Sequence, residues 1–449
     1  MEMIEYDMPD DFVWGAATSS YQIEGAYDKD GKGESIWDRF VREKGNVKHG
    51  HTGDVACDHY HRYQEDVELM QELNLDSYRF SISWPRILPQ GRGEVNQQGL
   101  KFYDNLIDEL LQAGIEPMVT IYHWDLPQAL QEVGGWTNRQ TVEAFVEYAE
   151  ILFQEFGDRV DNWITHNEPW VMSFVAHAFG EHAPGWEDFA SAVQVSHNLL
   201  VSHGLTVRRF RELVSGGNIG ITLDLHDIHP ASRRQNDIKA AEREDAFSNR
   251  WFLDPLYKGR YPQALYQHFQ NMLDAPAIQE GDMEIIQEDT DFLGINYYTR
   301  HVAKYDRDNE LYGFEDIDMI GNEHTEMGWE VYPDGLYNIL VRLAEEYTDD
   351  PLYITENGCA IDDKLDEYGI IHDKKRIDYY ASHLKAVERA AQSGVPIAGY
   401  YAWSLMDNFE WAYGYTKRFG LTYVDFETGE RTLKDSARWY SRVIEASRD

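Results

Sequence analysis

Eight short runs rich in apolar, β-branched and aromatic residues recur along the chain, separated by longer stretches with helical periodicity. This alternation is typical of strands that alternate with helices in a parallel sheet. The runs span residues 12–19, 77–84, 116–124, 160–167, 218–224, 291–298, 351–356 and 397–404. Eight units favour a closed (β/α)8 barrel over an open doubly wound sheet, which normally carries a glycine-rich phosphate turn after its first strand. The sequence has no such turn.

The stretches between the runs predict amphipathic helices. HYHRYQEDVELMQEL, GLKFYDNLIDELLQAG and TVEAFVEYAEILFQEFG return an apolar residue every three or four positions. Gly114, Gly157 and Gly394 follow such stretches, where a residue that tolerates positive φ is favoured. The charged run DKLDEYGIIHDKKRIDYY, residues 363–380, is interpreted as a loop followed by a surface helix with a solvated face. Because no repeat or linker interrupts the pattern, we expect residues 1–449 to form one domain.

The charge balance restricts the partners. The chain has 80 acidic and 40 basic residues and a formal net charge of −40, so we expect it to repel nucleic acid and anionic membranes. An enzyme adapted to high salt is our hypothesis, and an ordinary acidic protein is the alternative. The opening MEMIEYDMPDD lacks the basic start of a signal peptide, and no apolar run approaches about 20 residues. These features predict a cytoplasmic protein; the oligomeric state stays open, a homo-oligomer included.

Cysteine and histidine suggest no special chemistry. Cys57 and Cys359 cannot supply a disulfide framework, and we expect two buried thiols. The pairs His59 with His61 and His226 with His229 lack a ligand set in register, so we interpret them as solvated or structural and predict no metal site.

Polar and aromatic residues gather where the predicted strands end. In a barrel these ends converge on one face, which is where active sites lie. The set comprises Gln22, Arg79, His123, Trp124, Asn167, Glu168, Asn296, Tyr298, Glu356 and Trp403. The sequence therefore predicts a pocket at the carboxyl ends of the strands.

Two carboxylates in this set suit glycoside hydrolysis. Glu168 lies in THNEP and Glu356 in ITENG, each at the end of an apolar strand where an unpaired charge is costly to bury. Cleaving a glycosidic bond needs one carboxyl to protonate the departing oxygen and one carboxylate to meet the sugar carbon. A lone acid at a strand end is more often a structural hydrogen-bond acceptor, but two acids among these neighbours favour catalysis.

The motifs SYQIEG, YRFSISWPR, YHWDLPQAL, THNEPW, FLGINYY, MGWEVYPDGL, LYITENG and AWSLMDNFEWAYGY resemble the β-glucosidases of glycoside hydrolase family 1. The resemblance extends in order from about Asp10 to near Arg442. It implies a (β/α)8 barrel, a retaining double displacement and no cofactor. It also implies that Glu168 is the acid/base and Glu356 the nucleophile; plant thioglucosidases of the family lack the former.

The resemblance further assigns the residues around the two acids. It implies that Arg79 and Tyr298 hydrogen-bond the nucleophile and that Asn296 supports it. It places the terminal sugar against Gln22, His123, Asn167, Glu410, Trp403 and Trp411. Hydroxyl edges suit carboxylate, amide and imidazole partners, and C–H faces suit aromatic rings.

Other aromatic residues are assigned less uniformly. Trp329, in MGWE, resembles the family platform for the leaving-group sugar, and Trp124 follows His123 into the sugar subsite. For Phe419 and Tyr413, substrate contact and plain packing stay open.

The expected activity is exo-hydrolysis of terminal β-D-glucosyl residues from a small oligosaccharide or an aryl or alkyl β-glucoside. Cello-oligosaccharides are the first choice, with β-galactosides and β-fucosides as further substrates and transglycosylation left open. A phospho-β-glycosidase is the nearest alternative. Such members present Ser and Lys with a following Tyr where this chain has NFEWAYGY, and Glu410 would oppose a phosphate. A catalytically idle carbohydrate-binding barrel is the second alternative, although binding alone needs no matched acid and nucleophile.

Overall fold

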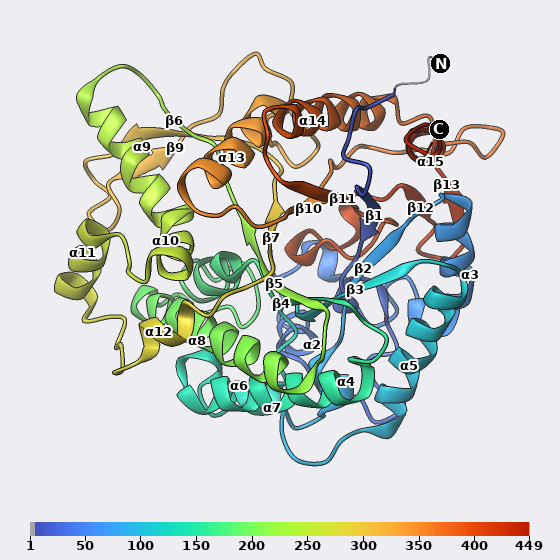
Figure 1. Cartoon of the computed structure of the whole chain (residues 1–449), viewed down its shortest axis with the longest axis horizontal. Coiled ribbons are helices and arrows are strands. Elements are labelled where there is room, and N and C mark those ends of the chain that lie inside the picture. Colours follow the sequence, from blue (N-terminus) through green and yellow to red (C-terminus); the bar gives the residue numbers. More distant parts are fainter. Residues whose placement is uncertain (1–4, 449) are drawn as a thin grey trace.

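The computed structural model describes residues 5–448, and its centre is a closed barrel of eight parallel strands (Figure 1). β1 pairs with β2 on one side and with β11 on the other, which closes the ring. The strands, in order around the barrel, are β1 (Val13–Ala17), β2 (Ser77–Ser81), β3 (Glu116–Tyr122), β4 (Asn162–Asn167), β5 (Asn218–Asp224), β7 (Phe292–Asn296), β10 (Leu352–Asn357) and β11 (Ile397–Trp403). All eight predicted strands are confirmed, with the ends of several runs trimmed.

Helices surround the barrel and bury their apolar faces against the strands (Figure 1). The long helices are α3 (His59–Glu72), α5 (Gln97–Gln112), α7 (Arg139–Phe156), α8 (Phe189–Leu213), α9 (Gln235–Ser248), α10 (Arg250–Lys258), α11 (Gln263–Leu273), α13 (Pro333–Glu346), α14 (Lys374–Gln392) and α15 (Asp435–Ala446). Single turns are α1 (Ser20–Ile23), α2 (Ile36–Phe40), α4 (Trp84–Ile87), α6 (Gln128–Gln131) and α12 (Asp282–Ile286). Within residues 5–448, no helix combines the length and apolar character needed to cross a membrane.

Two small sheets lie outside the barrel. β6 (Ile228–Pro230), β8 (His301–Tyr305) and β9 (Phe314–Asp316) form one, and β12 (Thr422–Val424) with β13 (Arg431–Leu433) forms the other. The first sheet belongs to the loops that follow β5 and β7, so it stands beside the carboxyl ends of the barrel strands.

The glycine predictions are right at two positions and wrong at one. Gly114 and Gly394 adopt positive φ, 75° and 91°. Gly157 instead keeps a right-handed conformation, with φ −69°. A Cβ atom there would lie 2.4 Å from the carbonyl oxygen of Phe153, so crowding rather than backbone handedness favours glycine at this position.

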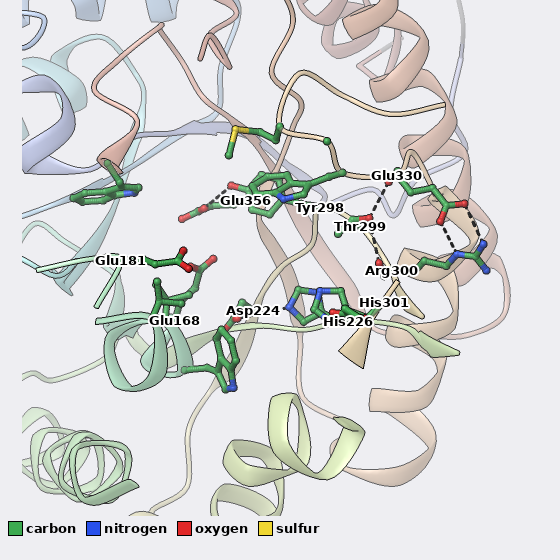
Figure 2. A pocket seen from close by; sticks show the side chains of 18 of the residues that line it. Glu168, Glu181, Asp224, His226, Tyr298, Thr299, Arg300, His301, Glu330 and Glu356 are labelled. Carbon is green, nitrogen blue, oxygen red and sulfur yellow. Dashed lines mark hydrogen bonds and ion pairs between the residues drawn. The ribbon is translucent and has the colours of Figure 1, made fainter. Parts of the chain in front are cut away.

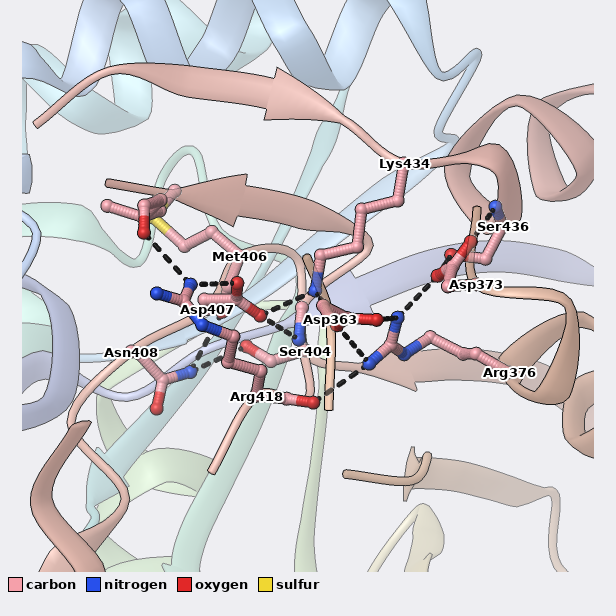
Figure 3. Close-up of polar contacts among 12 residues, drawn as sticks. Asp363, Asp373, Arg376, Ser404, Met406, Asp407, Asn408, Arg418, Lys434 and Ser436 are labelled. Atoms are coloured by element: carbon pink, nitrogen blue, oxygen red, sulfur yellow. Dashed lines mark hydrogen bonds and ion pairs between the residues drawn. The ribbon is translucent and has the colours of Figure 1, made fainter. Parts of the chain in front are cut away.

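The interpretation of residues 363–380 as a solvated face is wrong for three of its charged residues. Asp363, Asp373 and Arg376 are buried and belong to an ion-pair network (Figure 3). The Lys434 ammonium, which is fully buried, lies 2.6 Å from Asp363 and 2.7 Å from Asp407. Alternating charge signs let these residues pair with one another inside the protein instead of facing water.

The same network fixes the loop that follows β11. Asp407 also accepts from Arg418 at 2.5 Å and from the Gly420 amide at 2.9 Å. Because Asp407 lies three residues before Glu410, these bonds position the segment that carries Glu410 and Trp411 (Figure 3). Both cysteines are buried and free, as expected.

Candidate active site

A pocket of about 480 Å³ opens at the carboxyl ends of the barrel strands (Figure 2). Glu168 and Glu356 both line it, and they come from the ends of β4 and β10. The predicted residues His123, Trp124, Tyr298, Trp329, Trp403, Glu410, Trp411, Tyr413 and Phe419 line it as well. Gln22, Arg79, Asn167 and Asn296 are buried and do not line the pocket, and two of them, Arg79 and Asn296, hydrogen-bond the acids that do.

Three donors surround the Glu356 carboxylate. Arg79 Nη1 donates to Oε1 at 2.6 Å, and the Tyr298 hydroxyl donates to Oε2 at 2.7 Å. Burial raises the pKa of Glu356 above its ordinary value, and the charge of Arg79 with hydrogen bonds from Tyr298, Arg79 and Asn296 offsets part of this rise. These donors favour the ionised form of Glu356 over what burial alone would leave, and they hold the carboxylate in a fixed orientation.

Glu168 has a different environment. Its φ of +47° is uncommon for a residue with a side chain, and its amide is held by the Thr222 carbonyl at 3.0 Å. One carboxyl oxygen accepts from Asn296 Nδ2 at 2.6 Å. Burial, the charge of Glu356 and the charge of Asp224 raise the pKa of Glu168 well above its ordinary value.

The two environments place a shared proton on Glu168. Glu356 receives a buried guanidinium and a phenol, while Glu168 receives an amide and faces two further carboxylates. Asymmetry of this kind separates an acid from a base at one pH. The site can thus protonate a leaving oxygen from one side and offer a nucleophilic oxygen from the other.

Asn167 and its neighbours form a hydrogen-bond network around the two acids. Asn167 Oδ1 accepts from Arg79 at 2.6 Å and from Asn296 at 3.1 Å, and its amide nitrogen lies 3.1 Å from His123 Nε2. Thr355 donates to Asn296 at 2.8 Å. The side chains at the ends of five strands are therefore linked by hydrogen bonds.

Unpartnered polar atoms mark the deep end of the pocket. Glu410 Oε2 and His123 Nδ1 are buried without a hydrogen-bond partner in the described structure. Burial and the charge of Glu356 raise the pKa of Glu410 to about 8, and burial lowers the pKa of His123 well below its ordinary value. Buried polar groups are normally hydrogen-bonded, so these atoms suit a ligand with hydroxyl groups.

Gln22 lies beside this end of the pocket. Its amide nitrogen donates to Asn408 at 3.1 Å and to the Phe409 carbonyl at 2.8 Å, and its oxygen accepts from Ser19. The structure thus brings Gln22 against the loop of Glu410, with both amide hydrogens engaged.

Aromatic rings form two groups around the pocket. Trp124 and Trp411 lie 4.6 Å apart between centroids, and the His123 ring stacks 6.0 Å from both Trp403 and Trp411. Trp329, Tyr298 and Phe419 form the second group, with centroids 5.3–6.1 Å apart. Apolar walls of this kind pack against the C–H faces of a sugar.

Sequence reasoning missed several residues of this pocket, among them Asp224, His182, His226 and His301. Asp224 ends β5, so the rule that singled out the other strand ends could have found it. His182 is half-buried beside Trp124 in a loop with no periodic pattern. His226 lies on the loop after β5 and His301 begins β8, and their rings stack at 3.8 Å, which no local signal predicts.

Comparisons with known proteins agree with this geometry. The family model of glycosyl hydrolase family 1 matches residues 4–448. Beta-glucosidase A of Acetivibrio thermocellus is 50% identical over 98% of this chain and 99% of its own length. A bifunctional beta-D-glucosidase/beta-D-fucosidase of Bifidobacterium breve is 43% identical over 97% of this chain and 98% of its own.

A solved structure extends the likeness to three dimensions. The beta-glucosidase of Thermotoga maritima, in complex with deoxynojirimycin, superposes with a TM-score of 0.96 at 50% identity and covers 99% of each chain. The predicted resemblance and the predicted barrel are both confirmed. The chain belongs to glycosyl hydrolase family 1 and is a glycosidase of that family, similar over nearly its whole length to β-glucosidases.

Proposed function

We propose that this protein is a retaining, exo-acting β-glucosidase that works by double displacement. The proposal rests on the different environments of the two carboxyl groups in the pocket. Glu356 is paired with Arg79 and Tyr298, whereas Glu168 is kept protonated by burial and by neighbouring negative charge. Glycoside hydrolysis by two carboxyl groups needs one protonated and one ionised partner, and membership of glycosyl hydrolase family 1 supports the retaining form of this reaction.

In the first step, a Glu356 oxygen bonds to the anomeric carbon while Glu168 gives its proton to the departing glycosidic oxygen. Ester formation removes the charge of Glu356, so the pKa of Glu168 falls and the carboxylate can accept a proton. In the second step, water adds to the anomeric carbon, its proton passes to Glu168, and the ester bond to Glu356 breaks. An alcohol acceptor in place of water would give transglycosylation at the same site.

The substrate proposed is a terminal β-D-glucosyl residue on a cello-oligosaccharide or an aryl or alkyl glycoside. Glu410 and His123 supply unpartnered atoms for hydroxyls at the deep end, and Trp403 and Trp411 supply apolar faces. The relative from Bifidobacterium breve, named for glucosidase and fucosidase activity, supports β-fucosides as further substrates; we also propose β-galactosides. Trp329, in the second group of aromatic rings, would contact the leaving group.

The test is hydrolysis of p-nitrophenyl β-D-glucopyranoside by wild type and by Glu356→Ala, with and without azide. We expect the variant to lose nearly all activity. Azide should restore the release of p-nitrophenol, with α-glucosyl azide as the sugar product, because azide occupies the space of the missing carboxylate. A β-azide product would contradict retention. Cleavage of the 6-phosphate analogue alone would replace the proposal with a phospho-β-glycosidase, and inactivity on both would favour a binding protein.

A further inference from the structure

A cluster of one imidazole and two carboxylates stands on the pocket wall next to the small outer sheet. His301 begins β8, Asp316 ends β9, and Glu244 lies on α9, which packs against both strands. His301 Nδ1 lies 2.7 Å from Glu244 Oε1 and 3.1 Å from Asp316 Oδ2. A ligand atom from each of the three residues lies within 4.8 Å of the others.

The hydrogen bonds within this cluster leave part of the hydrogen-bonding capacity of its carboxylates unused. One imidazole nitrogen faces two carboxylate oxygens, and it can offer them one proton. Glu244 is 1% exposed, and its second oxygen, Oε2, is buried without a hydrogen-bond partner in the described structure. A buried carboxylate oxygen in this state normally has a partner, either a donor or a cation.

The neighbours of the cluster hold it in place. Asp316 Oδ1 accepts from the Val302 amide at 3.2 Å, which leaves Oδ2 directed at His301. The His226 ring stacks on His301 at 3.8 Å with 16° between planes, and this fixes the plane of the imidazole (Figure 2). Outer contacts that fix the orientation of ligands are a regular property of metal sites.

We propose that Glu244, His301 and Asp316 bind a divalent transition-metal cation, with Zn²⁺ as the best match. Zn²⁺ takes imidazole nitrogen and carboxylate oxygen at about 2.0–2.2 Å, and around a tetrahedral ion such ligand atoms lie roughly 3.4 Å apart. The present separations of 2.7 and 3.1 Å require the carboxylates to move slightly outward. Three protein ligands leave a coordination position that water can fill. The net charge of −40 adds a long-range attraction for cations.

The proposed metal site lies on the wall of the pocket. His301 and Asp316 both line the pocket that contains the two catalytic carboxyls, and Figure 2 shows Asp224 between Glu168 and the stacked histidines. A bound ion would join α9 to β8 and β9 and would place positive charge on this wall. The site is separate from Glu168 and Glu356, so the proposal does not depend on the proposed activity.

The test is a calorimetric titration of the full-length protein with ZnCl2, after chelator treatment, in a buffer with excess Mg²⁺ to occupy surface carboxylates. We expect one tight equivalent for wild type and at least a tenfold weaker Kd for Glu244→Gln, which keeps the shape of the side chain. His372→Gln is the matched control. His372 also contacts two aspartates, Asp435 and Asp366, but through opposite ring nitrogens at an exposed position, so it cannot chelate one ion.

A second measurement separates loss of the ligand from loss of the fold. Saturating Zn²⁺ should raise the Tm of wild type and His372→Gln but not that of Glu244→Gln, since an ion that binds only the native state stabilises it. Co²⁺ in place of Zn²⁺ should give a visible absorption band that the same variant lacks. Absence of a stoichiometric site in wild type, or equal Zn²⁺ affinity in Glu244→Gln, would overturn the proposal and leave a cluster in which Glu244 and Asp316 share a proton.

Discussion

The substitution Tyr298→Phe tests how Glu356, the proposed nucleophile, is kept ionised. The variant removes the hydroxyl that donates to Glu356 Oε2 at 2.7 Å and leaves the ring. A hydrogen bond to a charged group contributes about 1.5–3 kcal/mol. Since 1.36 kcal/mol corresponds to one pKa unit, the pKa of Glu356 should rise by about one to two. The proposed mechanism requires ionised Glu356, so the acid limb of kcat/KM should move to higher pH by about that amount.

The assay is the pH profile of kcat/KM for p-nitrophenyl β-D-glucopyranoside, with samples quenched into base so that the product absorbs equally at every pH. Tyr401→Phe is the matched control. Its hydroxyl is also buried but donates to Ser77 at the start of β2, the opposite end of the barrel from the pocket. An acid limb that stays within about 0.3 pH units of wild type, in a folded Tyr298→Phe protein, would refute the reasoning.

Three further outcomes are expected. Asp224→Asn removes a negative charge that raises the pKa of Glu168. Because the proposed mechanism requires protonated Glu168, the alkaline limb of kcat/KM should move to lower pH, and an unmoved limb would argue against the coupling. Lys434→Met leaves two buried carboxylates without their shared cation, and the free energy of unfolding measured in urea should fall by about 3–5 kcal/mol. The control Lys364→Met, which removes an exposed ammonium, should lower it by less than about 1 kcal/mol. The melting midpoint should rise from dilute to molar NaCl, since the Debye length falls from about 30 Å to about 3 Å and screens the net charge of −40; a flat curve would contradict adaptation to salt.

The barrel was predictable because its strands are buried on both faces and therefore stand out as short runs rich in apolar, β-branched and aromatic residues. The site was predictable to the extent that its residues end those runs, as Glu168 and Glu356 do. Asp224 obeys the same rule and was overlooked. Residues such as His182 come from long loops, whose paths depend on packing and not on local pattern.

Charge signs in the sequence did not reveal which charges are buried. Asp363 and Arg376 lie in a run that reads as an ordinary solvated surface, yet they pair with each other and with residues from distant segments. His226 and His301 are 75 positions apart, and their stacking accompanies the pairing of β6 with β8 outside the barrel. Pairings of this kind follow from the tertiary structure, which periodicity does not describe.

The position of Lys434 also has a consequence for the order in which the enzyme becomes active. Lys434 is near the end of the chain, and its ammonium contacts Asp407, in the segment that carries Glu410. A nascent or proteolysed chain that ends before residue 434 contains all eight barrel strands, but it lacks the ammonium that holds this loop and also α15, whose Trp439 and Tyr440 are buried in the core. We therefore expect a chain ending at residue 430 to hydrolyse substrate poorly, and full activity in such a chain would contradict this dependence. Catalytic competence would then be acquired late in synthesis, which keeps incomplete chains from acting on sugars.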